Sequence, residues 1–249
     1  MRVKFTAGLF IAAFLFSHQV NCQESSGKKD LINQISRKEA KEGWSLLFNG
    51  VSFDGWRGIN KQAFPSDGWK IENGMIHKTA VKGGDIITIR KYGNFILDWE
   101  WKMVSQGGNS GVKYIVNERK GDTGGYGYGL EYQILDDQDY IKKGQMKTND
   151  YHTMGALYEL YPPSPDKKPN PLGEWNKSRI VSKGSKVEHW LNGKLILECD
   201  RGSDDFKNKI AQSKFKNVEG YGIMPEGHIL LQYHDSEIYF RNIKIRELK

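Results

Sequence analysis

One stretch of the chain, Glu131 to Asp137 (EYQILDD), combines acids and an amide at a spacing suited to proton transfer on a sugar. Its alternation of residue types predicts a β-strand in which Glu131 and Gln133 share one face. A bulge near Leu135 would bring Asp136 round to the same face. Such a face offers a proton donor or acceptor and hydrogen bonds to hydroxyl groups, as a carbohydrate-processing site requires. A solvated strand with ordinary surface acids is the alternative.

This strand belongs to an all-β pattern that begins near Gly43. Short apolar or alternating runs recur at intervals of about ten residues, separated by Gly, Asn and Asp. Asn73-Gly74 and Asn192-Gly193 are two-residue turns that accept positive φ, so each predicts a hairpin. The predicted strands span 44–48, 69–72, 75–79, 85–88, 94–103, 111–116, 128–135, 178–183, 186–191, 194–198, 222–224, 229–234 and 238–246.

Aromatic-rich strands without a long helical period predict a β-sandwich or jelly roll. Residues 160–174 carry five of the seven prolines, so this segment is expected to be a loop across a face or rim of the sandwich. We predict one domain, residues 41–249, preceded by a polar linker at 23–40 that contains a short helical piece.

The N-terminus predicts export from a bacterial cell. Arg2 and Lys4 precede an apolar run from Phe5 to Phe16, so residues 1–22 have the organisation of a signal peptide and are too short to span a bilayer as a stable helix. Cys22 is either the lipidated residue of a lipoprotein or the last residue before the cleavage site. We therefore expect a periplasmic or cell-envelope protein, with membrane attachment only through Cys22.

Charge and cysteine content exclude other classes. The chain of 249 residues has a formal net charge of +7, but its lysines are scattered and no nucleic-acid-binding motif accompanies them. A nucleic-acid partner is therefore not expected. Cys199 is the one cysteine that follows the predicted signal peptide, so no disulfide can form within the domain, and its apolar neighbours predict a buried structural thiol.

Short motifs follow one another along the chain in a specific order. They are Leu47–Gly50 with Phe53–Trp56, Trp69–Ile76, Asn94-Phe95 with Glu100–Lys102, Asn109–Tyr114, Glu131–Asp137, Gly155–Tyr158, Gly173–Asn176, His189–Gly193, Ile229–His234 and Phe240–Ile243. Together they resemble the 3-keto-disaccharide hydrolase family, formerly a domain of unknown function. The resemblance implies a concanavalin A-like jelly-roll sandwich of two antiparallel sheets. In one departure, the family usually has an acid before the histidine of its last motif, whereas this chain has Tyr233 before His234.

The resemblance also implies cleavage of glycosides that are already oxidised at C3 of the sugar. A ketone at C3 acidifies the hydrogen on C2, a base removes it, the enolate expels the aglycone from C1, and water then adds back. Such a site needs a base near C2, donors or a cation near the C3 oxygen, and an acid near the leaving group. A separate sugar 3-dehydrogenase would supply the substrate, because this chain has no nucleotide-binding glycine motif.

The catalytic candidates are Glu131, His189, His234 and Asp136. Glu131 is the first choice for acid–base work, and the imidazoles suit proton transfer near neutral pH. His189 lies on an otherwise apolar strand face, so a hydrogen-bonded core histidine is its alternative. Asp136 would orient a base or hold a cation; its alternative is to end the strand through an Asx-type turn.

The substrate-binding candidates are Gln133, Lys113, Ser110, Tyr158, Trp175 and Arg179. Gln133 would hydrogen-bond the sugar, and Lys113 could polarise a C3 carbonyl as a point charge. Tyr158 and Trp175 are candidate stacking platforms for apolar sugar faces. Ser110 belongs to an Asn-Ser-Gly bend that would let a ligand approach the backbone. Arg179 could bind a sugar oxygen or form an ion pair.

No His, Cys or Glu cluster has a zinc-site spacing, so no metal centre is predicted. The acidic run at 136–139 could hold calcium through oxygen ligands. It lacks the glycine and the closing glutamate of a helix–loop–helix calcium site, which makes a solvated acidic loop the alternative.

Two other functions are compatible with the same fold. An endo-glucanase-like retaining hydrolase needs two carboxylates about 5 Å apart, but Gln133 stands where such an enzyme would carry the middle acid of its strand. A non-catalytic carbohydrate-binding module would use the same aromatic and amide groups for binding alone.

Overall fold

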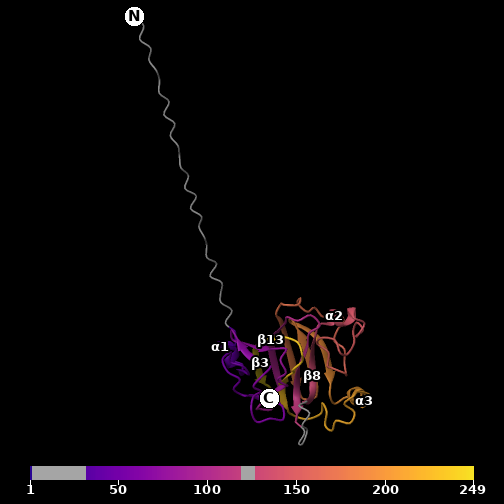
Figure 1. The fold of residues 1–249 in the computed structure, drawn as a ribbon. Helices are drawn as coiled ribbons and strands as arrows, with labels where there is room; N and C mark the ends of the chain where they lie inside the picture. Colours follow the sequence, from indigo (N-terminus) through magenta and orange to yellow (C-terminus); the bar gives the residue numbers. More distant parts are fainter. Residues whose placement is uncertain (2–31, 119–126) are drawn as a thin grey trace. The chain divides into compact units, whose positions relative to one another are not determined.

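The computed structural model describes Met1 and residues 32–118 and 127–249; the latter two ranges form two antiparallel β-sheets with three short helices (Figure 1). The described residues 32–118 and 127–249 belong to one compact unit. The predicted signal peptide beyond Met1, with Cys22, lies outside the described residues. In the described part of the chain, no helix is long and apolar enough to cross a membrane.

The larger sheet contains eight strands. Seven of them form one continuous path of hydrogen-bonded neighbours, and the eighth, β1, pairs with β13 outside this path. Along that path the order is β11 (Lys194–Asp200), β10 (Lys186–Leu191), β9 (Asn176–Lys183), β6 (Phe95–Met103), β13 (Ile238–Glu247), β4 (Met75–Lys78) and β3 (Trp69–Glu72), with β1 at Trp44–Leu46. The smaller sheet runs β2 (Trp56–Gly58), β5 (Ile86–Thr88), β12 (His228–Leu231), β7 (Asn109–Asn117) and β8 (Tyr128–Leu135). The predicted all-β sandwich of two antiparallel sheets is therefore confirmed.

The predicted hairpins form at both Asn-Gly turns. Asn73 and Gly74 have φ of 50° and 76°, and Asn192 and Gly193 have φ of 48° and 83°. Positive φ at both central residues gives a turn whose twist matches the flanking strands. β3 therefore pairs with β4, and β10 with β11.

The facing sides of the two sheets bury an aromatic core. Trp99 of β6 meets the ring of Tyr132 of β8 edge to face, with ring centroids 5.0 Å apart. Because Tyr132 points into this core, its neighbours Glu131 and Gln133 lie on the outer face of the smaller sheet.

The helices lie outside the sheets, and the strand pattern did not predict two of them. In Figure 1, α1 (Arg37–Lys41) and β3 lie on one side of the sandwich, and α2 (Asp137–Lys142) and α3 (Asp204–Gln212) on the other. Asp136 caps α2 and Ser203 caps α3, each by accepting a backbone N–H three residues on. The predicted strand at 222–224 is wrong, because these residues form turns.

The described part of the predicted linker contacts the sandwich. Asn33 exchanges hydrogen bonds with Asn242 of β13 and donates to the carbonyl of Gly74. Ser36 and Glu39 form a capping box at the start of α1.

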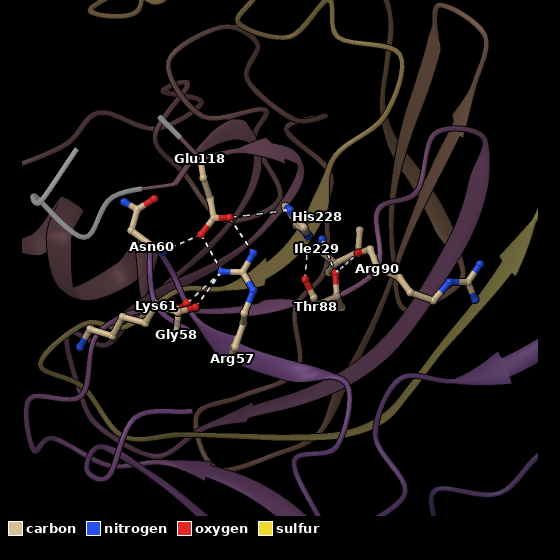
Figure 2. A network of polar contacts seen from close by, with 9 residues as sticks. All are labelled: Arg57, Gly58, Asn60, Lys61, Thr88, Arg90, Glu118, His228 and Ile229. Atoms are coloured by element: carbon tan, nitrogen blue, oxygen red, sulfur yellow. Dashed lines mark hydrogen bonds and ion pairs between the residues drawn. The ribbon is translucent and has the colours of Figure 1, made fainter. Parts of the chain in front are cut away.

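Figure 2 shows a network of hydrogen bonds and ion pairs that connects strands of the smaller sheet. Glu118 follows β7, and its carboxylate accepts two hydrogen bonds from the guanidinium of Arg57 in β2, at 2.7 and 2.6 Å. The backbone N–H of Asn60 donates to the same carboxylate at 2.6 Å. Nearby, Nδ1 of His228 donates to the carbonyl of Thr88 at 2.7 Å. These contacts connect β2 and β5 with β12 and β7, the strands that carry the site described below.

His189 of β10 lies inside the sandwich and is fully buried. Its Nδ1 is 3.0 Å from the carbonyl of Gly155 and its Nε2 is 2.9 Å from the Tyr114 hydroxyl. The carbonyl can only accept, so Nδ1 carries the proton and Nε2 accepts from Tyr114. Burial lowers the pKa of His189 to about 4.

This burial predicts a loss of stability in acid. Below pH 6.5 the unfolded chain binds a proton at His189 while the folded chain does not, so stability falls as the pH drops towards 4, by about 3 kcal/mol in all. The variant His189→Gln removes this contribution. Urea unfolding of both proteins between pH 4.5 and 7.5 measures it: the stability advantage of the native protein should shrink as the pH falls. A constant difference would contradict the assignment.

Candidate active site

A cavity of about 410 Å³ lies on the outer face of the smaller sheet. Strands β7 and β8 and the segment that follows β12 contribute polar side chains, and residues 214–218 contribute to the wall. The lining residues are Asn109, Lys113, Gly127, Tyr128, Glu131, Gln133, Tyr158, Lys214, Phe215, Val218, Gln232 and His234.

Three charged groups are buried together at this cavity. Lys113 of β7 stands directly opposite Glu131 of β8, and Nζ lies 3.6 Å from Oε2 of the carboxylate. Lys113 is 9% exposed and Glu131 is 4% exposed. Asp85, immediately before β5, is also buried and interacts electrostatically with both. Lys113 is therefore the positive charge that both buried carboxylates share, and Lys214 adds a second one for Glu131.

Amide groups hold the Glu131 carboxylate in place. The surrounding acceptors orient the Gln133 amide so that its NH₂ donates to Oε1 of Glu131 at 3.0 Å and to the carbonyl of Ser110 at 3.2 Å. The side chain of Gln232 also hydrogen-bonds Glu131. A Cβ at Gly111 would lie 2.8 Å from Oε1 of Glu131, so glycine is needed where the carboxylate crosses β7.

Burial makes the two carboxylates weaker acids than usual. Loss of hydration raises the pKa of Glu131, and the positive charges of Lys113 and Lys214 partly oppose this effect. Burial raises the pKa of Asp85 to about 6, against the opposing effects of Lys113 and the Tyr233 backbone N–H. Both groups would bind protons more readily than carboxylates in water.

Buried side chains from three segments fix the backbone of residues 232–234. The Ser110 hydroxyl donates to the carbonyl of Gln232 at 2.9 Å, and the N–H of Tyr233 donates to Oδ1 of Asp85 at 2.7 Å. Lys78 of β4 donates to the carbonyl of His234. These contacts hold the half-buried His234 at the cavity.

The surroundings of His234 disfavour its protonated form. Burial lowers its pKa, and the positive charge of Lys78 lowers it further. Lys78 is itself fully buried, and this burial lowers the pKa of its ammonium group to about 8.

Comparison with known proteins identifies the family. The model of the 3-keto-alpha-glucoside-1,2-lyase-like domain matches residues 43–246, which span nearly all of both sheets and every residue that lines the cavity. The chain belongs to this family. Its membership agrees with the resemblance found in the ordered motifs of the sequence.

Individual relatives extend the match over most of the chain. A 3-keto-disaccharide hydrolase from Bacteroides thetaiotaomicron is 33% identical over 233 residues, which cover 83% of this chain and 79% of that protein. A Parabacteroides distasonis crystal structure, assigned as a glycosyl hydrolase, has a TM-score of 0.78 at 36% identity and covers 88% of this chain and 100% of its own. A second structure from that organism has a TM-score of 0.61 at 31% identity and covers 82% and 99%.

Within this family fold, half of the predicted site residues meet at one cavity. They are Glu131, Gln133, Lys113, His234 and Tyr158. Ser110 lies directly beside them, but it is fully buried and holds the Gln232 backbone. The sequence predicted that the Asn-Ser-Gly segment would let a ligand approach the backbone. In the structure, the Glu131 carboxylate makes this close approach at Gly111.

Two predicted catalytic residues lie elsewhere. His189 is in the core, where its partners are Tyr114 and Gly155. The pairing of β7 with β8 runs without a shift from Tyr114 to Asn109, so the predicted bulge near Leu135 is wrong. Asp136 instead caps α2 and accepts the backbone N–H of Gly107 at 3.0 Å, so it does not join Glu131. It borders a second cavity of about 580 Å³.

Trp175 and Arg179 belong to the larger sheet or its margin and do not line the site cavity. The guanidinium of Arg241 lies over the ring of Trp175, 4.0 Å from its centre. Arg179 forms a two-point ion pair with Asp98, at 2.6 and 2.8 Å. Arg179 therefore forms the ion pair that the sequence offered as the alternative to sugar binding.

The acids of the run at 136–139 have partners within the protein. Asp137 is paired with Lys167 at 2.7 Å and accepts the backbone N–H of Met154. Asp139 is paired with Lys143 at 2.5 Å and accepts from Gln106. Among the described residues, no group of three or more His, Cys, Asp or Glu side chains is arranged to hold a metal ion.

The sequence did not indicate three contributors to the site. Gln232 shares a strand face with His234, and this alternation could have indicated it. Asp85 and Lys214 come from segments far from Glu131 in sequence. No local pattern marks them, because tertiary packing alone brings them near the glutamate.

The buried charges predict a pH-dependent cost of removing Lys113. In Lys113→Met, Glu131 and Asp85 lose their cation, so we expect a destabilisation of about 3–5 kcal/mol at pH 7. The loss should be smaller at pH 5, because Asp85, whose pKa burial raises to about 6, then binds a proton, and burial also favours the protonated form of Glu131. Urea unfolding at both pH values measures it, with Lys70→Met, at an exposed position on β3, as the control. An equal loss at both pH values would show that the charge cluster does not determine the effect.

Proposed function

We propose that the protein hydrolyses glycosides that carry a ketone at C3, including 3-keto-disaccharides, by elimination followed by addition of water. The observation that carries the proposal is the buried Glu131–Lys113 pair at the cavity. Membership of the 3-keto-alpha-glucoside-1,2-lyase-like family and the similarity to a 3-keto-disaccharide hydrolase support the substrate class.

Glu131 is suited to removing the hydrogen on C2. Its burial raises its pKa and makes its carboxylate a stronger base than a solvated one. The amide of Gln133 and the side chain of Gln232 fix its orientation, so little reorganisation is needed when a substrate binds.

Lys113 is suited to stabilising the enolate. Removing the C2 hydrogen moves negative charge onto the C3 oxygen, and a fixed cation in a site of low polarity stabilises such charge strongly. Oδ1 of Asn109 and Oε1 of Gln232 are buried and have no hydrogen-bond partner among the described residues. Both residues line the cavity, which makes these unpaired acceptors candidates for hydrogen bonds to sugar hydroxyl groups.

His234 is suited to the second half of the reaction. Expulsion of the aglycone leaves a double bond between C1 and C2, conjugated with the C3 ketone, and water must add at C1. A neutral imidazole can take a proton from that water, and burial together with Lys78 lowers the pKa of His234, which favours the neutral form.

The cavity is less suited to ordinary glycoside hydrolysis. Among its lining residues, as far as the structure describes them, Glu131 is the one carboxylate. Retention through a covalent intermediate requires a second carboxylate about 5 Å away. This favours the keto-glycoside over the unoxidised sugar as substrate.

The predicted signal peptide supports export to the periplasm or the cell envelope, with attachment through Cys22 if that residue is lipidated. The reaction also requires an earlier oxidation at C3. We therefore propose a sugar 3-dehydrogenase as the functional partner.

Release of the aglycone from matched substrates tests the function. The purified protein should cleave a 3-keto-glucoside and leave its unoxidised parent intact. Glu131→Gln should lower the rate with the keto substrate by about 10²–10⁴-fold, the usual contribution of a positioned acid–base group. Glu198→Gln, at an exposed strand position in the larger sheet, is the control and should keep full activity.

Two outcomes would contradict the proposal. Cleavage of the unoxidised parent at a similar rate would indicate an ordinary glycosidase. Binding of both sugars without release of either aglycone would indicate a carbohydrate-binding module.

A further inference from the structure

Tyr158 stands beside Glu131 on the side away from Lys113. Its N–H donates to the carbonyl of Glu131 at 3.1 Å, and the neighbouring residues Leu157 and Tyr132 form an antiparallel bridge. Residues opposite one another in such a pairing direct their side chains to the same face. Lys113, Glu131 and Tyr158 therefore form a row across one face, and all three line the cavity.

Lys214 determines which way the Tyr158 hydroxyl can donate. Its Nζ donates to the hydroxyl oxygen at 2.9 Å and lies 4.2 Å from the centre of the ring. An ammonium group has donors only, so the hydroxyl accepts from Lys214 and keeps its own proton for another acceptor. A cation at this distance also stabilises negative charge on the phenol oxygen.

A chain of polar contacts holds Lys214 in this position. Glu159 Oε1 lies 3.2 Å from Nζ of Lys214 and 3.1 Å from Nε2 of His152, whose Nδ1 lies 2.7 Å from Asp150. Glu159 has a φ of 68°, in the left-handed region that a residue with a side chain rarely adopts. Strain of this kind persists where surrounding contacts require it, and it concentrates at functional sites.

We propose that Tyr158 is the acid that protonates the departing oxygen of the aglycone, and that Lys214 is its positioning residue. This assignment rests on the proposed function, which requires a proton at that oxygen and left its donor unassigned. It adds a proton-donor role to the stacking role expected for Tyr158 from the sequence.

The proton and electron balance of the step is complete. Glu131 takes the proton from C2, and the C–H electron pair forms the enolate. That pair then forms the C1–C2 double bond as the C1–O bond breaks with its electrons on the aglycone oxygen. That oxygen takes the proton of Tyr158, and the resulting phenolate faces the Lys214 ammonium. When water adds at C1, Glu131 returns its proton to C2, His234 releases the proton of that water to solvent, and a solvent proton restores Tyr158.

Leaving-group dependence tests the proposal, because a stable leaving group departs without a proton. The 3-keto-glucoside of 4-nitrophenol and a 3-keto-disaccharide are compared in the native protein and in Tyr158→Phe. The variant should lose about 10²–10⁴-fold in rate on the disaccharide and little on the nitrophenyl substrate. Tyr161→Phe is the matched control, because its hydroxyl binds Asp205 and it does not line the cavity.

Lys214 provides an independent variant at an exposed position. Lys214→Met should show the same selective loss on the disaccharide, and Lys214→Arg should recover part of it. This pair decides the question if Tyr158→Phe does not fold.

An equal loss on both substrates, or no loss on either, would overturn the role of Tyr158 while leaving the proposed function intact. If the native protein releases neither aglycone, the proposed function fails and the assignment of Tyr158 fails with it.

Discussion

Glu131 is almost fully withdrawn from water, and a buried carboxylate is tolerated only where charges and N–H donors replace its hydration. In this sandwich the replacement comes from several strands at once. β7 supplies Lys113 and the space above Gly111, β8 supplies the Gln133 amide, and the segment after β12 supplies Gln232. If the pairing of β7 with β8 slipped by one residue, the side chains that one of these strands contributes to the site would point into the core. The register of the smaller sheet and the network around Glu118 therefore matter for the site as well as for the fold.

The same constraint links stability to chemistry. A carboxylate deprived of water is a stronger base, and a lysine fixed beside it can stabilise an enolate as soon as that base has acted. Asp85 shares this lysine and also holds the backbone of Tyr233, next to His234. The cluster of Lys113, Glu131 and Asp85 therefore makes burial of the carboxylates possible. It also positions Glu131 and His234, the groups that would transfer protons. Tyr158 and Lys214 complete the row on the other side of Glu131.

The sequence predicted most strands because alternation and Asn-Gly turns are local signals. The strand at 128–135 has the predicted bounds, and both Asn-Gly hairpins form. Short helices such as α2 and α3 were missed, because one or two turns leave no sustained period and their stability comes from caps and tertiary packing. Asp136 illustrates the point: the same residue can end a strand, cap a helix or serve a site, and only the observed register decides among these roles.

For the site, the sequence indicated groups on one strand face and missed those that long-range packing adds. Glu131 and Gln133 followed from alternation, and Lys113 was a candidate because a lysine can polarise a carbonyl as a point charge. His189 has the residue type and spacing of a catalytic group, but its strand directs it into the core, where Tyr114 and Gly155 satisfy it. Lys214 belongs to the segment after α3, whose position relative to Glu131 no local pattern specifies.

The central claim is that Glu131 removes the hydrogen on C2 of an oxidised sugar. A 3-keto-glycoside labelled with deuterium at C2 tests this claim most directly, with the reaction stopped at partial conversion and the recovered substrate as a control for exchange without enzyme. The account predicts slower release of the aglycone from the labelled substrate than from the unlabelled one, and replacement of deuterium by solvent hydrogen in the product to the extent that Glu131 exchanges its deuteron before water adds. Equal rates for the two substrates together with full retention of deuterium at C2 would contradict it.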